Sequence, residues 1–145
     1  MDIFSESIKN IKSLDKPIIY LSGPIQKCSD EECFGWRNDL INKLSDIYTL
    51  IDPTIRDYRN VPKTPKMCRE ICEKDKYEIR KSDLIIVNAL FSKGSWGTPM
   101  EVMYAYMLGI PIITVTNTMN PWLSHHSYKI FDSFDCVVKY LRKLN

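Results

Sequence analysis

Apolar residues gather in short runs that are separated by longer stretches of mixed polarity. Three runs rich in β-branched residues cover 17–21, 84–89 and 110–116, and a weaker fourth run covers 48–51. Continuous apolar runs of this length, each leading into a loop or turn, are typical of strands buried on both faces. The sequence therefore predicts four strands.

The stretches between these runs have the spacing of amphipathic helices. Residues 30–44 open with three acidic residues and then place apolar side chains, together with Arg37, on one face. Residues 67–81 and 98–108 show two more helical patterns, and 134–144 would close the chain as either a short strand or a helix. The alternation predicts an α/β fold: a single-domain, doubly wound (flavodoxin- or Rossmann-like) parallel sheet of four to five strands flanked by helices.

Length and charge narrow the class of protein. The 145 residues fit one domain, 1–145, and the loosely helical start, 1–14, is expected to pack on its body. A net charge of +2, with basic and acidic residues interleaved, points to no nucleic acid partner. No apolar run approaches the ~18 residues of a membrane span, and the first residues do not resemble a signal peptide, so we expect a cytoplasmic protein without membrane contact.

Cysteine and histidine spacing gives no sign of a metal or cofactor site. The five cysteines form no CxxC pair, and the adjacent His125 and His126 have no third ligand spaced nearby. Cys68 and Cys72 share a helix face and are predicted to be core residues. The chain has no glycine-rich dinucleotide fingerprint and no P-loop, so neither metal nor cofactor is expected.

Ligands of such sheets bind outside the carboxyl ends of the strands. This rule selects three loops, 22–31, 52–66 and 90–97. The second loop is long and rich in proline, arginine and lysine. It fits either a mobile substrate loop or a solvated connection.

One predicted helix, 98–109, is apolar on every side except for Glu101 in its first turn. A helix of this kind is buried, and Glu101 should face the ligand crevice because it follows a strand and its loop. Thr98, with Pro99 next and Glu101 three residues on, also fits a capping box, which is a purely structural role. Both interpretations stay open at this point.

A second carboxylate, Asp75, falls in the middle of an apolar helical stripe formed by Cys68, Ile71, Cys72 and Ile79. Such a position is costly unless the carboxylate is paired or hydrogen-bonded, so a structural salt bridge is one explanation. Another is a catalytic pair with Glu101. Two carboxylates in unlike environments are what the cleavage of glycosidic bonds requires.

Three motifs carry a resemblance to a known family. They are IYLSGPI at residues 19–25, Asp75 placed eight residues before Asp83 in KSDLII, and GTPMEVMYA at residues 97–105. In their order and spacing, over about residues 17–125, the chain resembles the nucleoside 2-deoxyribosyltransferases and the related 2'-deoxynucleoside 5'-phosphate N-hydrolases. The resemblance implies one domain of this type, with Glu101 as the nucleophile and Asp75 and Tyr20 as further catalytic residues.

The resemblance also implies where a substrate is held. Its first loop would bind phosphate and comprises Ser22, Gly23, Pro24, Ile25 and Lys27, the last as the candidate to replace an arginine of mammalian-type hydrolases. Six residues before the nucleophile the transferases usually have aspartate, whereas the hydrolases resemble this chain in having serine, here Ser95. A second hydrolase serine, contributed by a neighbouring subunit, resembles Ser124. Trp96, beside Gly97, lies outside the family pattern and fits either stacking on the base or packing.

These features predict an enzyme that cleaves the N-glycosidic bond of a nucleoside 5'-monophosphate, in a homodimer or higher homo-oligomer with shared sites. Serine hydroxyls can donate to a phosphate, which an aspartate would repel. The alternatives are a transferase acting on free deoxynucleosides, an NAD-cleaving hydrolase, and a nucleotide-binding module in which Glu101 only caps its helix.

Overall fold

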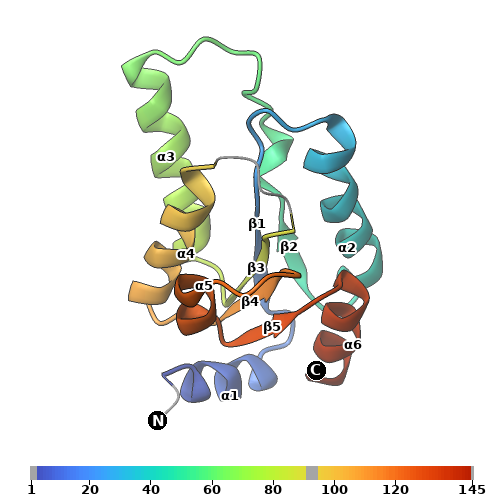
Figure 1. Cartoon of the computed structure of the whole chain (residues 1–145). Helices are drawn as coiled ribbons and strands as arrows, with labels where there is room; N and C mark the ends of the chain where they lie inside the picture. The colour runs from blue at the N-terminus through green and yellow to red at the C-terminus, as the bar shows by residue number, and fades with distance from the viewer. Residues whose placement is uncertain (1–2, 91–94, 145) are drawn as a thin grey trace.

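A parallel sheet of five strands forms the middle of the protein, with helices on both faces (Figure 1). The computed structural model describes residues 3–90 and 95–144. The strands are β1 (Ile18–Ser22), β2 (Thr49–Ile51), β3 (Leu84–Asn88), β4 (Ile112–Val115) and β5 (Lys129–Phe131). They are arranged in the order β2-β1-β3-β4-β5, which is the flavodoxin-like order. The predicted α/β class and doubly wound parallel sheet are confirmed.

The helices form the two outer layers. They are α1 (Ser5–Ser13), the π-helical turn η1 (Glu31–Gly35), α2 (Trp36–Leu44), the short 3₁₀ turn η2 (Pro53–Ile55), α3 (Pro65–Arg80), α4 (Gly97–Met107), α5 (Pro121–His126) and α6 (Phe134–Leu144). Side chains of α1, α2 and α6 share one buried cluster with the sheet, and those of α3 and α4 share the other. The expected packing of the N-terminal segment is confirmed, since Phe4, Ile8 and Ile11 are buried.

The elements β5 and α5 were not predicted, and two expected packings are wrong. Helix α4 was expected to be buried, but its Met100 and Met107 are exposed. The short strand β5 begins with two exposed residues, Lys129 and Ile130, so its sequence has no apolar run; α5 is only six residues long. The closing segment is a helix, one of the two alternatives. Cys68 and Cys72 are exposed, because the first half of α3 extends beyond the sheet (Figure 1).

The alternation of side chains along β1 decides which residues face α4. Ile19 and Leu21 point into the cluster with α2 and α6, whereas Tyr20 belongs to the cluster with α3 and α4. Because successive side chains of a strand point to opposite faces, Ser22 lies on the same face as Tyr20. The carboxyl end of β1 therefore presents two hydroxyls toward α4.

A fully buried guanidinium, that of Arg37 on α2, holds the carboxyl ends of β1 and β2 together. Its Nη1 donates to the carbonyl oxygen of Cys33 at 2.6 Å, and its Nη2 donates to that of Gly23 at 3.1 Å. Its Nε lies 3.8 Å from Oδ1 of Asp52, directly after β2. Arg37 thus fixes the loop after β1 against the π-helical turn that precedes α2.

Gly23 allows this close approach because it has no side chain. A Cβ at this position would lie 2.8 Å from Cζ2 of Trp36 and 3.2 Å from Cβ of Asn88. Both distances are shorter than ordinary carbon contacts. The glycine therefore lets the loop after β1 pass between α2 and the end of β3.

We expect Arg37→Met to lower the free energy of unfolding by about 3 to 5 kcal/mol, because the change removes the donor to the buried carbonyl oxygens of Leu21, Gly23 and Cys33 while keeping most of the volume. Urea unfolding followed by circular dichroism measures this loss. Arg142→Met is the matched control, since Arg142 is exposed and pairs with Asp46 at the surface. Similar losses in the two variants would contradict the role assigned to Arg37.

Candidate active site

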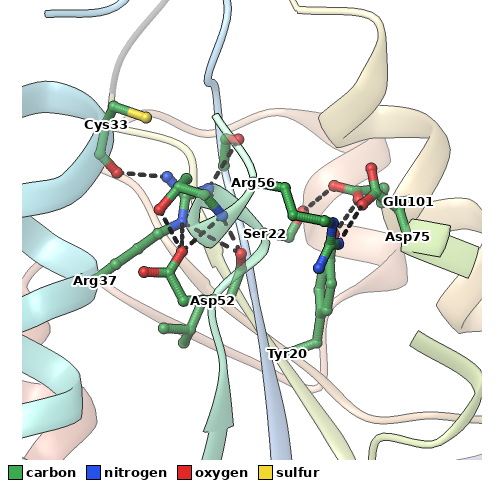
Figure 2. A network of polar contacts seen from close by, with 11 residues as sticks. Tyr20, Ser22, Cys33, Arg37, Asp52, Arg56, Asp75 and Glu101 are labelled. Carbon is green, nitrogen blue, oxygen red and sulfur yellow. Dashed lines mark hydrogen bonds and ion pairs between the residues drawn. The ribbon is translucent and has the colours of Figure 1, made fainter. Parts of the chain in front are cut away.

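Two hydroxyls from β1 hold the carboxylate of Glu101 on α4. Tyr20 Oη donates to Glu101 Oε2 at 2.6 Å, and Ser22 Oγ donates to Glu101 Oε1 at 2.8 Å (Figure 2). In a capping box the Glu101 side chain would accept from the Thr98 N–H. Here that N–H donates to Ser95 Oγ instead, at 3.3 Å. The capping-box interpretation of Glu101 is therefore wrong, and its carboxylate faces the end of β1.

The surroundings of Glu101 favour its neutral form. Burial, followed by the charge of the nearby Asp75, raises the pKa of this carboxyl to about 7, against the lowering effect of the hydrogen bonds from Tyr20 and Ser22 and of the charge of Arg37. Burial also raises the pKa of Tyr20 far above its usual range, so Tyr20 stays protonated and acts as a donor. The site thus holds a carboxyl that titrates near neutral pH.

Asp75 on α3 is the second carboxyl of the site. It is half-buried, and burial, followed by the charge of Glu78, raises its pKa to about 6 against the lowering effect of Arg56 and Arg37. Its Oδ1 lies 3.8 Å from Nη2 of Arg56. The salt bridge expected for Asp75 is therefore present, and its charge also acts on the Glu101 carboxyl. The catalytic pair stays a prediction.

A pocket of about 430 Å³ lies at the carboxyl end of β3, between α4 and α5, and neither Glu101 nor Asp75 is among its lining residues. Pro24 and Val102, which are close in sequence to Ser22 and Glu101, line its near side. Most of its wall is apolar, and Ser95 and Asn120 are among the few polar residues. The pocket has the size and lining of a site for a small organic molecule.

Three solved structures have a similar arrangement of strands and helices. A 2-deoxyribosyltransferase from Bacillus psychrosaccharolyticus superposes with a TM-score of 0.70 and 18% identity, covering 88% of this chain and 95% of its own. A conserved protein from Enterococcus faecalis V583 gives 0.70 and 14%, covering 88% and 98%. A CMP N-glycosidase from Clostridium botulinum gives 0.57 and 19%, covering 86% and 98%. The chain shares their fold.

The fold implied by the sequence resemblance is therefore confirmed, over nearly the whole length of those proteins. Comparisons of sequence alone add nothing to it: no family model and no curated protein matches the chain.

The first loop is placed next to the carboxyl cluster, with one difference from expectation. The hydroxyl of Ser22 is buried against Glu101 and does not lie free in the loop. Gly23 and Pro24 are buried, and Ile25 is half-buried. Lys27 is exposed, with a left-handed backbone at φ 60°. Part of the third predicted loop, residues 91–94, lies outside the described residues.

The remaining predicted site residues lie at the start of α4 and on α5. Ser95 lines the pocket, whereas Trp96 beside it is 87% exposed and stacks on no described residue. Gly97 begins α4, with no described atom near a Cβ placed there. Ser124 is exposed and lines a separate hollow of about 260 Å³, so it does not reach the Glu101 of its own chain.

Several polar residues around the site were missed by the sequence analysis. Arg37 had been placed on an apolar helix face, and a charge at such a position is the same signal that identified Asp75. Glu78 is three residues from Asp75 and could have been recognised as its neighbour on the helix surface. Arg56 has no such signal, because a solvated loop is equally rich in arginine.

The described part of the chain has neither a metal-binding cluster nor a membrane-spanning helix. Over residues 3–90 and 95–144, no group of three or more histidine, cysteine, aspartate or glutamate side chains could hold a metal ion. Within the same residues, no helix is long and apolar enough to cross a membrane.

We expect Glu101→Gln to stabilise the protein at neutral and alkaline pH. As the pH rises from about 4.5 to about 7, an unfolded chain loses the Glu101 proton while the folded chain keeps it, so this carboxyl costs the folded state stability above that window. The glutamine cannot ionise and avoids this cost. The gain should be on the order of 2 kcal/mol at pH 8 and vanish near pH 4.

Thermal unfolding at pH 4, 6 and 8 measures this difference between wild type and Glu101→Gln. Glu70→Gln is the control, because Glu70 is exposed on α3. A difference that does not change with pH would contradict the raised pKa.

Proposed function

We propose that this protein is an enzyme that cleaves the N-glycosidic bond of a nucleoside 5'-monophosphate and releases the free base and the sugar phosphate. The observation that carries the proposal is the Glu101 carboxylate, fixed between the hydroxyls of Tyr20 and Ser22 with the carboxyl of Asp75 close by. Two carboxyls with raised pKa values are suited to nucleophilic attack and to proton transfer. The shared fold with a CMP N-glycosidase and a 2-deoxyribosyltransferase supports the same chemistry.

The proposed reaction is a retaining double displacement. Glu101 attacks C1' of the sugar while the bond between C1' and the base breaks, and the bond electrons pass to the base. Asp75 gives its proton to the departing base. Water then attacks C1', the bond to Glu101 breaks, and the water proton returns to Asp75. Tyr20 and Ser22 keep the attacking carboxylate in one orientation, and no metal or cofactor enters the reaction.

Phosphate binding is proposed for the pocket beside Glu101. Ser95 lies there at the start of α4, where a hydroxyl can donate to a phosphate oxygen. Ser124 would join from a second copy of the chain. Exposed apolar side chains on α4 and α5 support such an assembly: Trp96, Met100, Met107 and Trp122 are 66–87% exposed. We therefore propose a homodimer or higher homo-oligomer with shared sites.

A transferase that moves deoxyribose between bases is the second candidate. The 2-deoxyribosyltransferase with the same fold favours it, since a second base could replace water in the last step. Ser95 favours the hydrolase, because it stands where such transferases usually have aspartate. The two differ in whether a free base must be present and in whether phosphate is required.

We expect Glu101→Ala to abolish base release while the protein remains folded, because the attacking group is lost. A panel of ribo- and deoxynucleoside 5'-monophosphates, free nucleosides and NAD, with liberated base measured by chromatography, identifies the substrate and tests the variant. Glu70→Ala on the surface of α3 should retain full activity. Near-normal turnover by Glu101→Ala would remove this residue from the mechanism.

We expect Ser95→Asp to weaken the use of monophosphates far more than that of free nucleosides. Two like charges about 4 Å apart repel by roughly 4 kcal/mol at an effective dielectric of about 20, which exceeds the loss of one hydrogen bond. The kcat/KM values for a monophosphate and its nucleoside measure the effect, and exposed Ser5→Asp on α1 is the control. Equal losses for both substrates would favour the transferase.

A further inference from the structure

An arginine from the long loop after β2 reaches into the carboxyl cluster. Nη2 of Arg56 lies 2.7 Å from Oε1 of Glu78 and 3.8 Å from Oδ1 of Asp75. Figure 2 shows its guanidinium beside Asp75. The second predicted loop, 52–66, is therefore held to the carboxyl cluster at Arg56.

Pairing Arg56 with Glu78 has a desolvation cost, because the Glu78 carboxylate is buried. Its side chain is only 6% exposed, and its Oε2 is buried without a hydrogen-bond partner among the described residues. A buried ion pair adds little net stability, because desolvation of both charges offsets their attraction. What the pair does achieve is to hold the guanidinium of Arg56 in one place, next to Asp75.

Two nitrogens of the Arg56 guanidinium remain available as hydrogen-bond donors. Among the described residues, the contacts of Arg56 with carboxylates use only Nη2, and Nε and Nη1 have no side-chain or carbonyl partner. The side chain is 29% exposed, which leaves these N–H groups accessible to a bound molecule. A charged, fixed, fork-shaped donor beside an acid is suited to an acceptor oxygen that gains negative charge.

We propose that Arg56, positioned by Glu78, donates to the carbonyl oxygen that adjoins the glycosidic nitrogen of the leaving base, and that the substrates are accordingly pyrimidine nucleotides. This inference rests on the proposed function. Asp75 and Arg56 are side by side, as are the ring nitrogen N1 and the oxygen O2 of a pyrimidine. In a purine the corresponding acceptor is the ring nitrogen N3, which has one lone pair and lies within the ring, whereas O2 of a pyrimidine projects from the ring and has two.

The contribution of Arg56 to the reaction follows from where the electrons go. When the bond between C1' and N1 breaks, its electron pair stays on the base and spreads onto O2, while the bond between C1' and Glu101 forms. A guanidinium at O2 stabilises this charge more in the transition state than in the bound substrate. The proton of Asp75 then neutralises the base.

The test compares a poor and a good leaving group on the same sugar phosphate. Uridine 5'-monophosphate and its 5-fluoro analogue, each in ribo and deoxy form, are given to wild type and to Arg56→Gln. We expect kcat to fall about 100-fold with uracil and only about 10-fold with 5-fluorouracil, because the more acidic base needs less help to leave. Wild type should prefer pyrimidine over purine monophosphates by at least about 10-fold.

Three further variants separate this role from a merely structural one. Glu78→Gln should show the same dependence on the leaving group with a smaller loss, since the amide oxygen still accepts from Arg56. Arg56→Lys keeps the positive charge and replaces the glutamine variant if that variant does not fold. It should show the same dependence on the leaving group. Arg69→Gln removes an exposed guanidinium from α3 and should leave both rates unchanged.

Two results would overturn the inference alone. Equal losses with uracil and 5-fluorouracil, or a change confined to KM, would make Arg56 a tether of its loop or a ground-state contact. Purine monophosphates cleaved as well as pyrimidine monophosphates would overturn the substrate class. Absence of base release by wild type from every nucleotide and nucleoside would instead overturn the proposed function, and this inference with it.

Discussion

The buried guanidinium of Arg37 is the interaction on which the shape of the site depends. It joins the loop after β1, the π-helical turn before α2 and the aspartate after β2, all at the carboxyl edge of the sheet. Ser22 and Gly23 hold their positions because this edge is fixed. The same charge also lowers the pKa values of Asp75 and Glu101, so Arg37 links the packing of the fold to the electrostatics of the site.

The sequence predicted best those features that follow from a regular period. Alternation of apolar runs with helical patterns predicted the parallel sheet, and single charges within apolar helices located Glu101 and Asp75. The same rule misjudged Cys68 and Cys72, because it assumes that a helix is covered along its whole length, whereas the first half of α3 extends past the sheet. Contacts across the fold, such as that of Arg56 with Glu78, have no period and could not be predicted.

The carboxyls of the site have two different kinds of hydrogen-bond and ion-pair partner. Glu101 is held by neutral donors on β1, whereas Asp75 and Glu78 on α3 meet the cationic Arg56 from the loop. Hydroxyl donors keep a carboxylate in place without cancelling its charge, which suits a nucleophile. The Arg56 guanidinium contacts two carboxylates and still presents donors to solvent. This suits the side of the site where the base would leave in the proposed reaction.

The raised pKa values of the two carboxyls, about 7 for Glu101 and about 6 for Asp75, mean that the pair retains a proton near neutral pH. In the free protein the two pKa values are close, so Glu101 and Asp75 share the proton, whereas the proposed mechanism needs it on Asp75. The proposed reaction would favour the second of these arrangements. Positive charge develops on the sugar beside Glu101 and favours its ionised form, while negative charge develops on the base and favours a protonated Asp75. In the proposed mechanism the transition state therefore favours the required proton distribution more strongly than the resting site does, which is the condition for catalysis.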